Sequence, residues 1–66
     1  MAIAKIVEVS ASSPKSFDDA IEQGIAKATE TVRGIKGAWV SEQTVKVDDD
    51  KIVEYRVALR VSFVVE

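Results

Sequence analysis

Apolar and polar residues alternate through residues 51–65, and this alternation is the clearest pattern in the chain. A period of two is the spacing of side chains that point to the same face of a β-strand. The pattern therefore predicts a strand with one face against a core and a mostly polar opposite face. The apolar face would hold Val53, Tyr55, Val57, Leu59, Val61, Phe63 and Val65, and the other face Glu54, Arg56, Ala58, Arg60, Ser62 and Val64.

Residues 17–33 show the three- and four-residue spacing of an amphipathic helix. Ser16 is a favourable N-cap, and Asp18 and Asp19 suit the positive end of the helix dipole. Gly24 lowers helix stability by about 1 kcal/mol relative to Ala, but its missing side chain lets the helix approach a sheet closely. The apolar stripe comprises Phe17, Ala20, Ile21, Gly24, Ile25, Ala28 and Val32.

Two further strands are predicted, over residues 2–9 and 36–47, with a loop at residues 10–14 and a turn at residues 48–50. In the second of these strands, alternation places Ala38 and Val40 on one face. The other face would carry Gly37, Trp39, Ser41, Gln43 and Val45. The element order predicts an α+β fold, a single β-α-β-β domain over residues 1–66. Its three-stranded antiparallel sheet, of order 1-3-2, would wrap on the helix, with Ile21, Leu59 and Phe63 in the core.

Composition indicates that the chain does not work alone. A 66-residue chain buries little of its surface and usually needs disulfides, a metal or oligomerisation, and this chain has no Cys and no His. The predicted sheet also leaves two strand edges and one face open, which natural proteins rarely tolerate. We therefore expect a homo-oligomer.

Charge and motif content exclude several classes of function. A net charge of −2 does not suit binding to nucleic acid. The chain has no apolar run long enough to span a membrane and no signal-peptide pattern, so we expect a cytoplasmic protein. It contains no Ser/His/Asp set, no Gly-rich phosphate loop and no Cys/His metal spacing, so we expect no enzymatic activity.

A few residues could bind a ligand. Arg56 and Arg60 share the polar face of the third strand, where they would hold an anionic ligand or form ion pairs with Glu42 and Glu54. Trp39 would anchor an interface or stack on a planar ligand. The three aspartates at residues 48–50 would hold a hard cation or form a solvated turn.

The order of these segments resembles the dodecin family. The resemblance runs from about Lys5 to Glu66 and includes SSPKSFDDAI at residues 12–21 and EYRVALRVSF at residues 54–63. It implies hollow homododecamers of β-α-β-β subunits. Such assemblies bind a small-molecule ligand, a flavin such as riboflavin, lumichrome or FMN, in pairs at subunit interfaces and store or buffer it.

The resemblance also implies which positions hold the flavin. In flavin-binding members a Trp early in the second strand stacks on the isoalloxazine ring, and a Gln near the start of the third strand bonds its polar edge. These positions are Gly37 and Arg56 here. Gly offers no stacking surface, and Arg donates hydrogen bonds but cannot accept them. Trp39, about 6–7 Å further along the same strand face, would partly replace the missing ring.

Two functions remain open. The first is a dodecin-like, flavin-binding storage protein that works as a homododecamer, with its cofactor site at Gly37, Trp39 and Arg56. The alternative is a dodecin-fold shell that binds no flavin but a metal ion such as calcium, or another anionic small molecule. This alternative follows because the Tyr55–Arg56 pair resembles a second branch of the family, which lacks the Trp and Gln and is linked to calcium.

Overall fold

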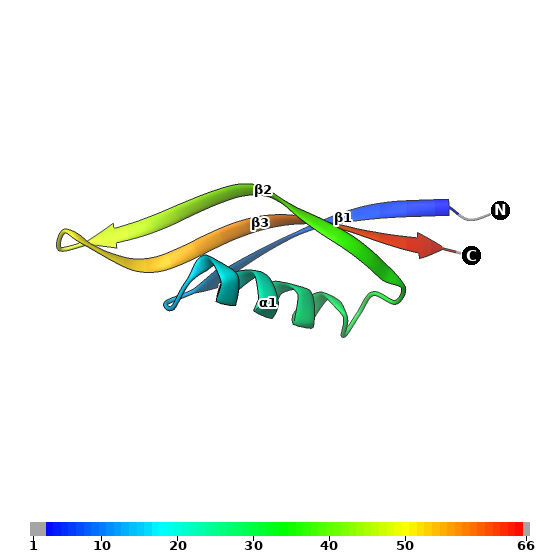
Figure 1. Cartoon of the computed structure of the whole chain (residues 1–66), viewed down its shortest axis with the longest axis horizontal. Helices are drawn as coiled ribbons and strands as arrows, with labels where there is room; N and C mark the ends of the chain where they lie inside the picture. Colours follow the sequence, from blue (N-terminus) through cyan, green and yellow to red (C-terminus); the bar gives the residue numbers. More distant parts are fainter. Residues whose placement is uncertain (1–2, 66) are drawn as a thin grey trace.

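The computed structural model describes residues 3–65 and has the element order β1 (Ile3–Ser13), α1 (Phe17–Ala28), β2 (Ile35–Asp48) and β3 (Lys51–Val65). The three strands form one antiparallel sheet of order β1-β3-β2, which confirms the predicted topology. Helix α1 lies across one face of this sheet, and the β2–β3 hairpin extends beyond the start of the helix (Figure 1). None of the described helices is long and apolar enough to cross a membrane.

The core lies where α1 crosses the middle of β3. Its buried cluster consists of Ala20, Val57, Leu59 and Val61, and Ile21 of α1 and Val40 of β2 pack against it. The apolar row of β3 is thus confirmed at its centre, but Val53 and Val65 at its ends are 42% and 39% exposed. The reason is length, because a 12-residue helix spans only about 18 Å and cannot cover a 15-residue strand.

Two predicted boundaries were wrong. Strand β1 continues through the expected loop to Ser13, because its last residues stay paired with β3 as far as Ser13 opposite Tyr55. Residue 2, where that strand was expected to begin, lies outside the described residues. Helix α1 ends at Ala28 rather than Arg33, since Thr29 takes the C-cap position and its hydroxyl donates to the carbonyl of Ala26 at 2.7 Å.

A β-bulge in β2 corrects the predicted faces of that strand. Val40 lies opposite Leu59, but the next paired residue is Glu42, opposite Ala58, so Ser41 is the extra residue. An extra residue reverses the alternation beyond it. Gln43 and Val45 therefore share the helix-covered face with Val57 and Tyr55, and not the face of Trp39 as predicted.

A hydrogen-bond network fixes the connection between β1 and α1. Ser13 is 1% exposed, and its hydroxyl donates to Asp19 Oδ2 at 2.5 Å and accepts from the Lys15 backbone N–H at 3.0 Å. The Ser16 hydroxyl accepts from the Asp19 backbone N–H at 3.0 Å, which confirms the predicted N-cap. Gln23 also donates to Asp19 Oδ2 at 2.7 Å. The start of the helix is thereby tied to the end of β1.

Candidate functional site

The sheet face opposite α1, which we call the open face, carries the predicted site residues. Residues directly opposite each other in an antiparallel pair project to the same face. The register therefore places Trp39, Arg60 and Glu8 in one row across the three strands, and Thr44, Arg56 and Ser12 in another. Between them lies a row formed by Glu42, Ala58 and Ser10. The open face is thus polar and centred on β3.

A hollow of about 350 Å³ occupies the middle of the open face. Ala58 leaves room at its centre because a methyl group stands there between longer neighbours. Hydroxyl, guanidinium and carboxylate groups surround it, so it suits a polar ligand. The open-face residues that line it are Ser10, Ser12, Glu42, Thr44, Arg56 and Ala58.

Ion pairs hold both open-face arginines. Arg56 Nε donates to Glu54 Oε2 at 2.7 Å, and this bond is the main cause that lowers the pKa of Glu54 below its ordinary value of 4.5. Arg60 Nε donates to Glu8 Oε2 at 3.2 Å across the β1–β3 ladder. Both arginine side chains are more than half exposed, so solvent screens the two ion pairs.

The pairing of Arg60 corrects a prediction. Glu54 was correctly named as a partner, but Glu42 lies opposite Ala58 rather than opposite either arginine, and within residues 3–65 it forms no ion pair. Glu8, the actual partner of Arg60, was missed. Strand order 1-3-2 does place β1 beside β3, but the side-chain pattern alone does not fix which residue of β1 faces Arg60.

Gly37 leaves an open position on the same face. It lies opposite Ser62, whose hydroxyl donates to the Gly37 carbonyl at 3.2 Å. A Cβ atom built on Gly37 would contact only that hydroxyl, at an ordinary distance of 3.6 Å. A Cβ atom therefore fits there without a clash. Trp39, two residues along, is 46% exposed, so its indole ring is accessible to a planar ligand or to another chain.

A single chain does not bring all three predicted site residues together. Gly37 pairs with Ser62, whereas Arg56 lies six residues away on the same strand. At about 3.3 Å per residue, this separation is roughly 20 Å. Trp39, opposite Arg60, is still about 13 Å from Arg56. One flavin-sized ligand that touches both ends must lie between chains.

The aspartates of the β2–β3 turn form no metal centre by themselves. Asp48 is the last residue of β2, and Asp49 and Asp50 form the two-residue loop with φ of 51° and 63°. No group of three or more potential ligands that could hold a metal ion occurs within residues 3–65. A cation bound there would need ligands from elsewhere.

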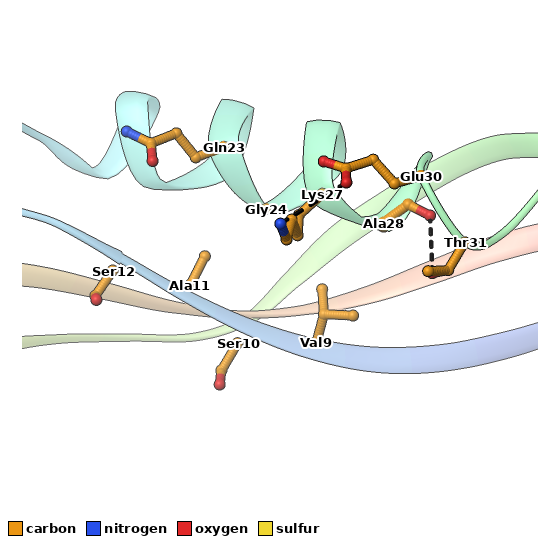
Figure 2. Close-up of a pocket in the computed structure, with 10 residues that line it drawn as sticks. All are labelled: Val9, Ser10, Ala11, Ser12, Gln23, Gly24, Lys27, Ala28, Glu30 and Thr31. Carbon is orange, nitrogen blue, oxygen red and sulfur yellow. Dashed lines mark hydrogen bonds and ion pairs between the residues drawn. The ribbon is translucent and has the colours of Figure 1, made fainter.

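A larger groove lies on the other side of the sheet, between β1 and α1. Figure 2 shows Val9 and Ala11 pointing from β1 toward the helix, while Ser10 and Ser12 point away to the open face. The groove has a volume of about 730 Å³, and Gly24 and Ala28 line it from the helix. Its rim carries the exposed Lys27–Glu30 pair, 3.7 Å apart.

Comparison with known proteins shows which proteins this chain is similar to. The dodecin family model matches residues 3–66. Calcium dodecin of Mycobacterium tuberculosis is 33% identical over 63 residues, which cover 96% of this chain and 89% of that protein. A crystal structure of a calcium-chelating calcium dodecin from the same organism superposes with a TM-score of 0.82 and 33% identity, covering 92% of this chain and 87% of that one.

Another solved structure agrees more closely in shape. A mutant dodecin of Thermus thermophilus superposes with a TM-score of 0.94 at 29% identity, covering 100% of this chain and 98% of that one. The family model thus matches nearly the whole chain. The β-α-β-β order and the 1-3-2 sheet are consistent with this match. The chain belongs to the dodecin family.

Proposed function

We propose that this chain forms a homododecamer that binds and stores a flavin, riboflavin or FMN, at the open face between neighbouring subunits. The observation that carries the proposal is the exposed Trp39, which stands on a polar sheet face beside the open position at Gly37. An indole ring presents a flat apolar surface, and such surfaces stack on planar rings. The Trp39–Arg60–Glu8 row places hydrogen-bonding groups next to it.

The distances within one chain support a site made by several subunits. Arg56 lies about 13 Å from Trp39 and roughly 20 Å from Gly37 on one chain, so a ring that stacks on Trp39 beside Gly37 and also contacts an Arg56 would take that residue from a neighbour. Family membership is consistent with such an assembly. Flavin binding would then depend on oligomerisation, because neighbouring subunits would supply parts of the same site.

A titration of riboflavin fluorescence tests this function. Stacking on an indole ring is expected to quench flavin emission, so the wild-type protein should reduce the signal and saturate. Trp39→Ala should weaken binding by about five- to 150-fold, which corresponds to one stacked ring. Glu22→Ala is the control, because Glu22 is exposed on α1, on the other side of the sheet from Trp39. Equal affinity of the two variants would argue against a site at Trp39.

Calcium is the second candidate ligand. Calcium dodecin of Mycobacterium tuberculosis is 33% identical to this chain, which favours this alternative. Because residues 3–65 contain no three-ligand group within one chain, carboxylates of several chains would have to converge on the ion. A colourless protein that leaves riboflavin emission unchanged, and that releases heat when calcium is added after chelation, would establish this alternative in place of flavin storage.

A further inference from the structure

A third hollow, of about 310 Å³, lies where the α1–β2 connection meets the end of β3. Arg33, Gly34, Lys36 and Val64 line it, and both cationic residues are exposed. Gly34 has a φ of 77° and contributes only backbone atoms, and its carbonyl accepts from the Val64 N–H at 3.3 Å. The hollow therefore has a wall of ordered backbone and two cationic side chains at its rim.

The charge of this hollow differs from that of the other two. The groove beside α1 contains Lys27 together with Glu30, and the open-face hollow contains Arg56 together with Glu42. The third contains two cations, and no carboxylate of residues 3–65 lines it. Neither Arg33 nor Lys36 takes part in the ion pairs of this described part of the chain. A positive site thus stands on a chain whose net charge is −2.

Arg33 and Lys36 have no ion-pair partner among residues 3–65, and a bound anion would reduce the repulsion between them. Arg presents a planar set of N–H donors that matches two oxygens of a phosphate group, and Lys adds a compact charge. Gly34 lies close to the Val64 backbone, where an added Cβ atom would be 3.3 Å from the Val64 carbonyl oxygen, so backbone atoms form this part of the wall. We propose that this hollow binds the phosphate group of a small molecule, at a site distinct from the ring-binding part of the open face.

The test is calorimetric titration of inorganic pyrophosphate into the full-length protein at low salt. Wild-type protein should bind, and the double variant Arg33→Gln/Lys36→Gln should bind at least tenfold more weakly. Lys46→Gln/Lys51→Gln is the matched control, since it removes two exposed cations of the β2–β3 hairpin and should change the affinity less than twofold. Both pairs of residues are exposed, so all proteins should melt at similar temperatures.

Two results would overturn the proposal. One is the absence of pyrophosphate binding to the wild-type protein. The other is an equal loss of affinity in both double variants, which would reflect overall charge and not a site. Neither result depends on flavin binding, because the probe carries no ring.

A competition experiment then distinguishes two sources of the phosphate. Lys36 directly precedes Gly37, so the phosphate of FMN could reach this hollow if the proposed flavin site is correct. Pyrophosphate that displaces FMN but not riboflavin would identify the phosphate ester of the flavin as the ligand. Pyrophosphate that displaces neither would identify free phosphate or diphosphate. Both results support a phosphate site at Arg33 and Lys36.

Discussion

Gly37 and Arg56 are the residues at which this chain departs most clearly from the flavin-binding pattern that its sequence resembles. The structure leaves space for a Cβ atom at Gly37, which would contact only the Ser62 hydroxyl. Arg56 uses its Nε–H group for Glu54 at 2.7 Å, and its remaining N–H groups can donate to a ligand but cannot accept. A weak or altered flavin site is thus the expected consequence of two particular side chains and not of a different fold.

Restoring both residues should strengthen flavin binding. Gly37→Trp supplies a stacking ring, which contributes about 1–3 kcal/mol, and Arg56→Gln supplies a group that both donates and accepts. We expect the double variant to bind riboflavin about five- to 150-fold more tightly than the wild type, measured by fluorescence quenching. The two single variants serve as controls for additivity. An unchanged dissociation constant would mean that these positions do not contact the ring.

Asp19 should make stability depend on acidity. The Ser13 hydroxyl, with smaller contributions from Gln23 and Lys15, lowers the pKa of Asp19 below its ordinary value of 3.8. A carboxyl group with a lowered pKa in the folded state stabilises the fold above its unfolded pKa. That stability is lost as the pH falls from about 4 through the lowered value. The melting temperature should therefore drop in this acidic window.

The variant Asp19→Asn should melt at a lower temperature than the wild type at neutral pH and show a smaller decrease on acidification. Asp18→Asn is the matched control, because Asp18 lies in the same first turn but forms no side-chain hydrogen bond within the described residues. Melting curves followed by circular dichroism between about pH 6 and pH 2 measure both effects. Parallel curves for wild type and Asp19→Asn would show that the network does not contribute.

At the scale of elements, the sequence predicted best the helix and the strand that have one apolar face and one polar face. Strand β3 alternates strictly, and α1 has one apolar stripe, so both were placed correctly over most of their length. The faces of strand β2 were harder to predict, because the bulge at Ser41 reverses them and no local residue pattern indicates a bulge there. Residues 10–13 contain three serines and an alanine, which looks like a loop, yet backbone pairing with β3 holds them in β1.

The close packing of α1 on the sheet depends on Gly24. A Cβ atom at this position would lie 3.0 Å from Leu59 Cδ1 and 3.1 Å from Ala11 Cβ. Leu59 is 1% exposed and has little freedom to move, and Ala11 Cβ is fixed to the strand backbone. The predicted close approach of helix and sheet is therefore confirmed.

Gly24→Ala should destabilise the protein although Ala is the better helix former. The helix gains about 1 kcal/mol from propensity, but overpacking of a filled core costs about 1–3 kcal/mol. We expect a net loss of about 1 kcal/mol in chemical denaturation. Ala26→Gly, at an exposed position of the same helix, isolates propensity and should cost about 1 kcal/mol. A Gly24→Ala protein more stable than the wild type would mean that the helix is free to shift.

At the scale of the whole molecule, a single chain has more surface than its size warrants. Its radius of gyration is 13.6 Å, whereas a compact 66-residue domain has about 11 Å. Its accessible area is 4960 Å², against about 4,100 Å² for a folded monomer of this mass. Apolar side chains contribute to this excess, and several stand more than 40% exposed near the hairpin tip: Val45, Val47, Ile52 and Val53.

The candidate site could be predicted only in part, because its residues lie too far apart on one chain to form a site without a second chain. The sequence identified Trp39, Gly37 and Arg56 as positions of interest, and the structure places all three on the open face. Their separation of up to roughly 20 Å means that the geometry of a site between chains is set by neighbouring subunits. Periodicity reports which face a residue occupies within one chain, but it does not report which residue of a second chain lies opposite.

The assembly itself should be large, closed and required for stability. Extended shape, exposed apolar side chains and open sheet edges all cost free energy in an isolated chain, and the absence of Cys excludes stabilisation by disulfides. Size-exclusion chromatography with light scattering should give about twelve chain masses at micromolar concentration. The double variant Val47→Glu/Ile52→Glu, on the hairpin that α1 leaves uncovered, should shift the mass toward smaller species. Lys46→Glu/Lys51→Glu is the control for added negative charge on the same hairpin and should leave the mass unchanged. A wild-type monomer or dimer under these conditions would contradict the proposed homododecamer.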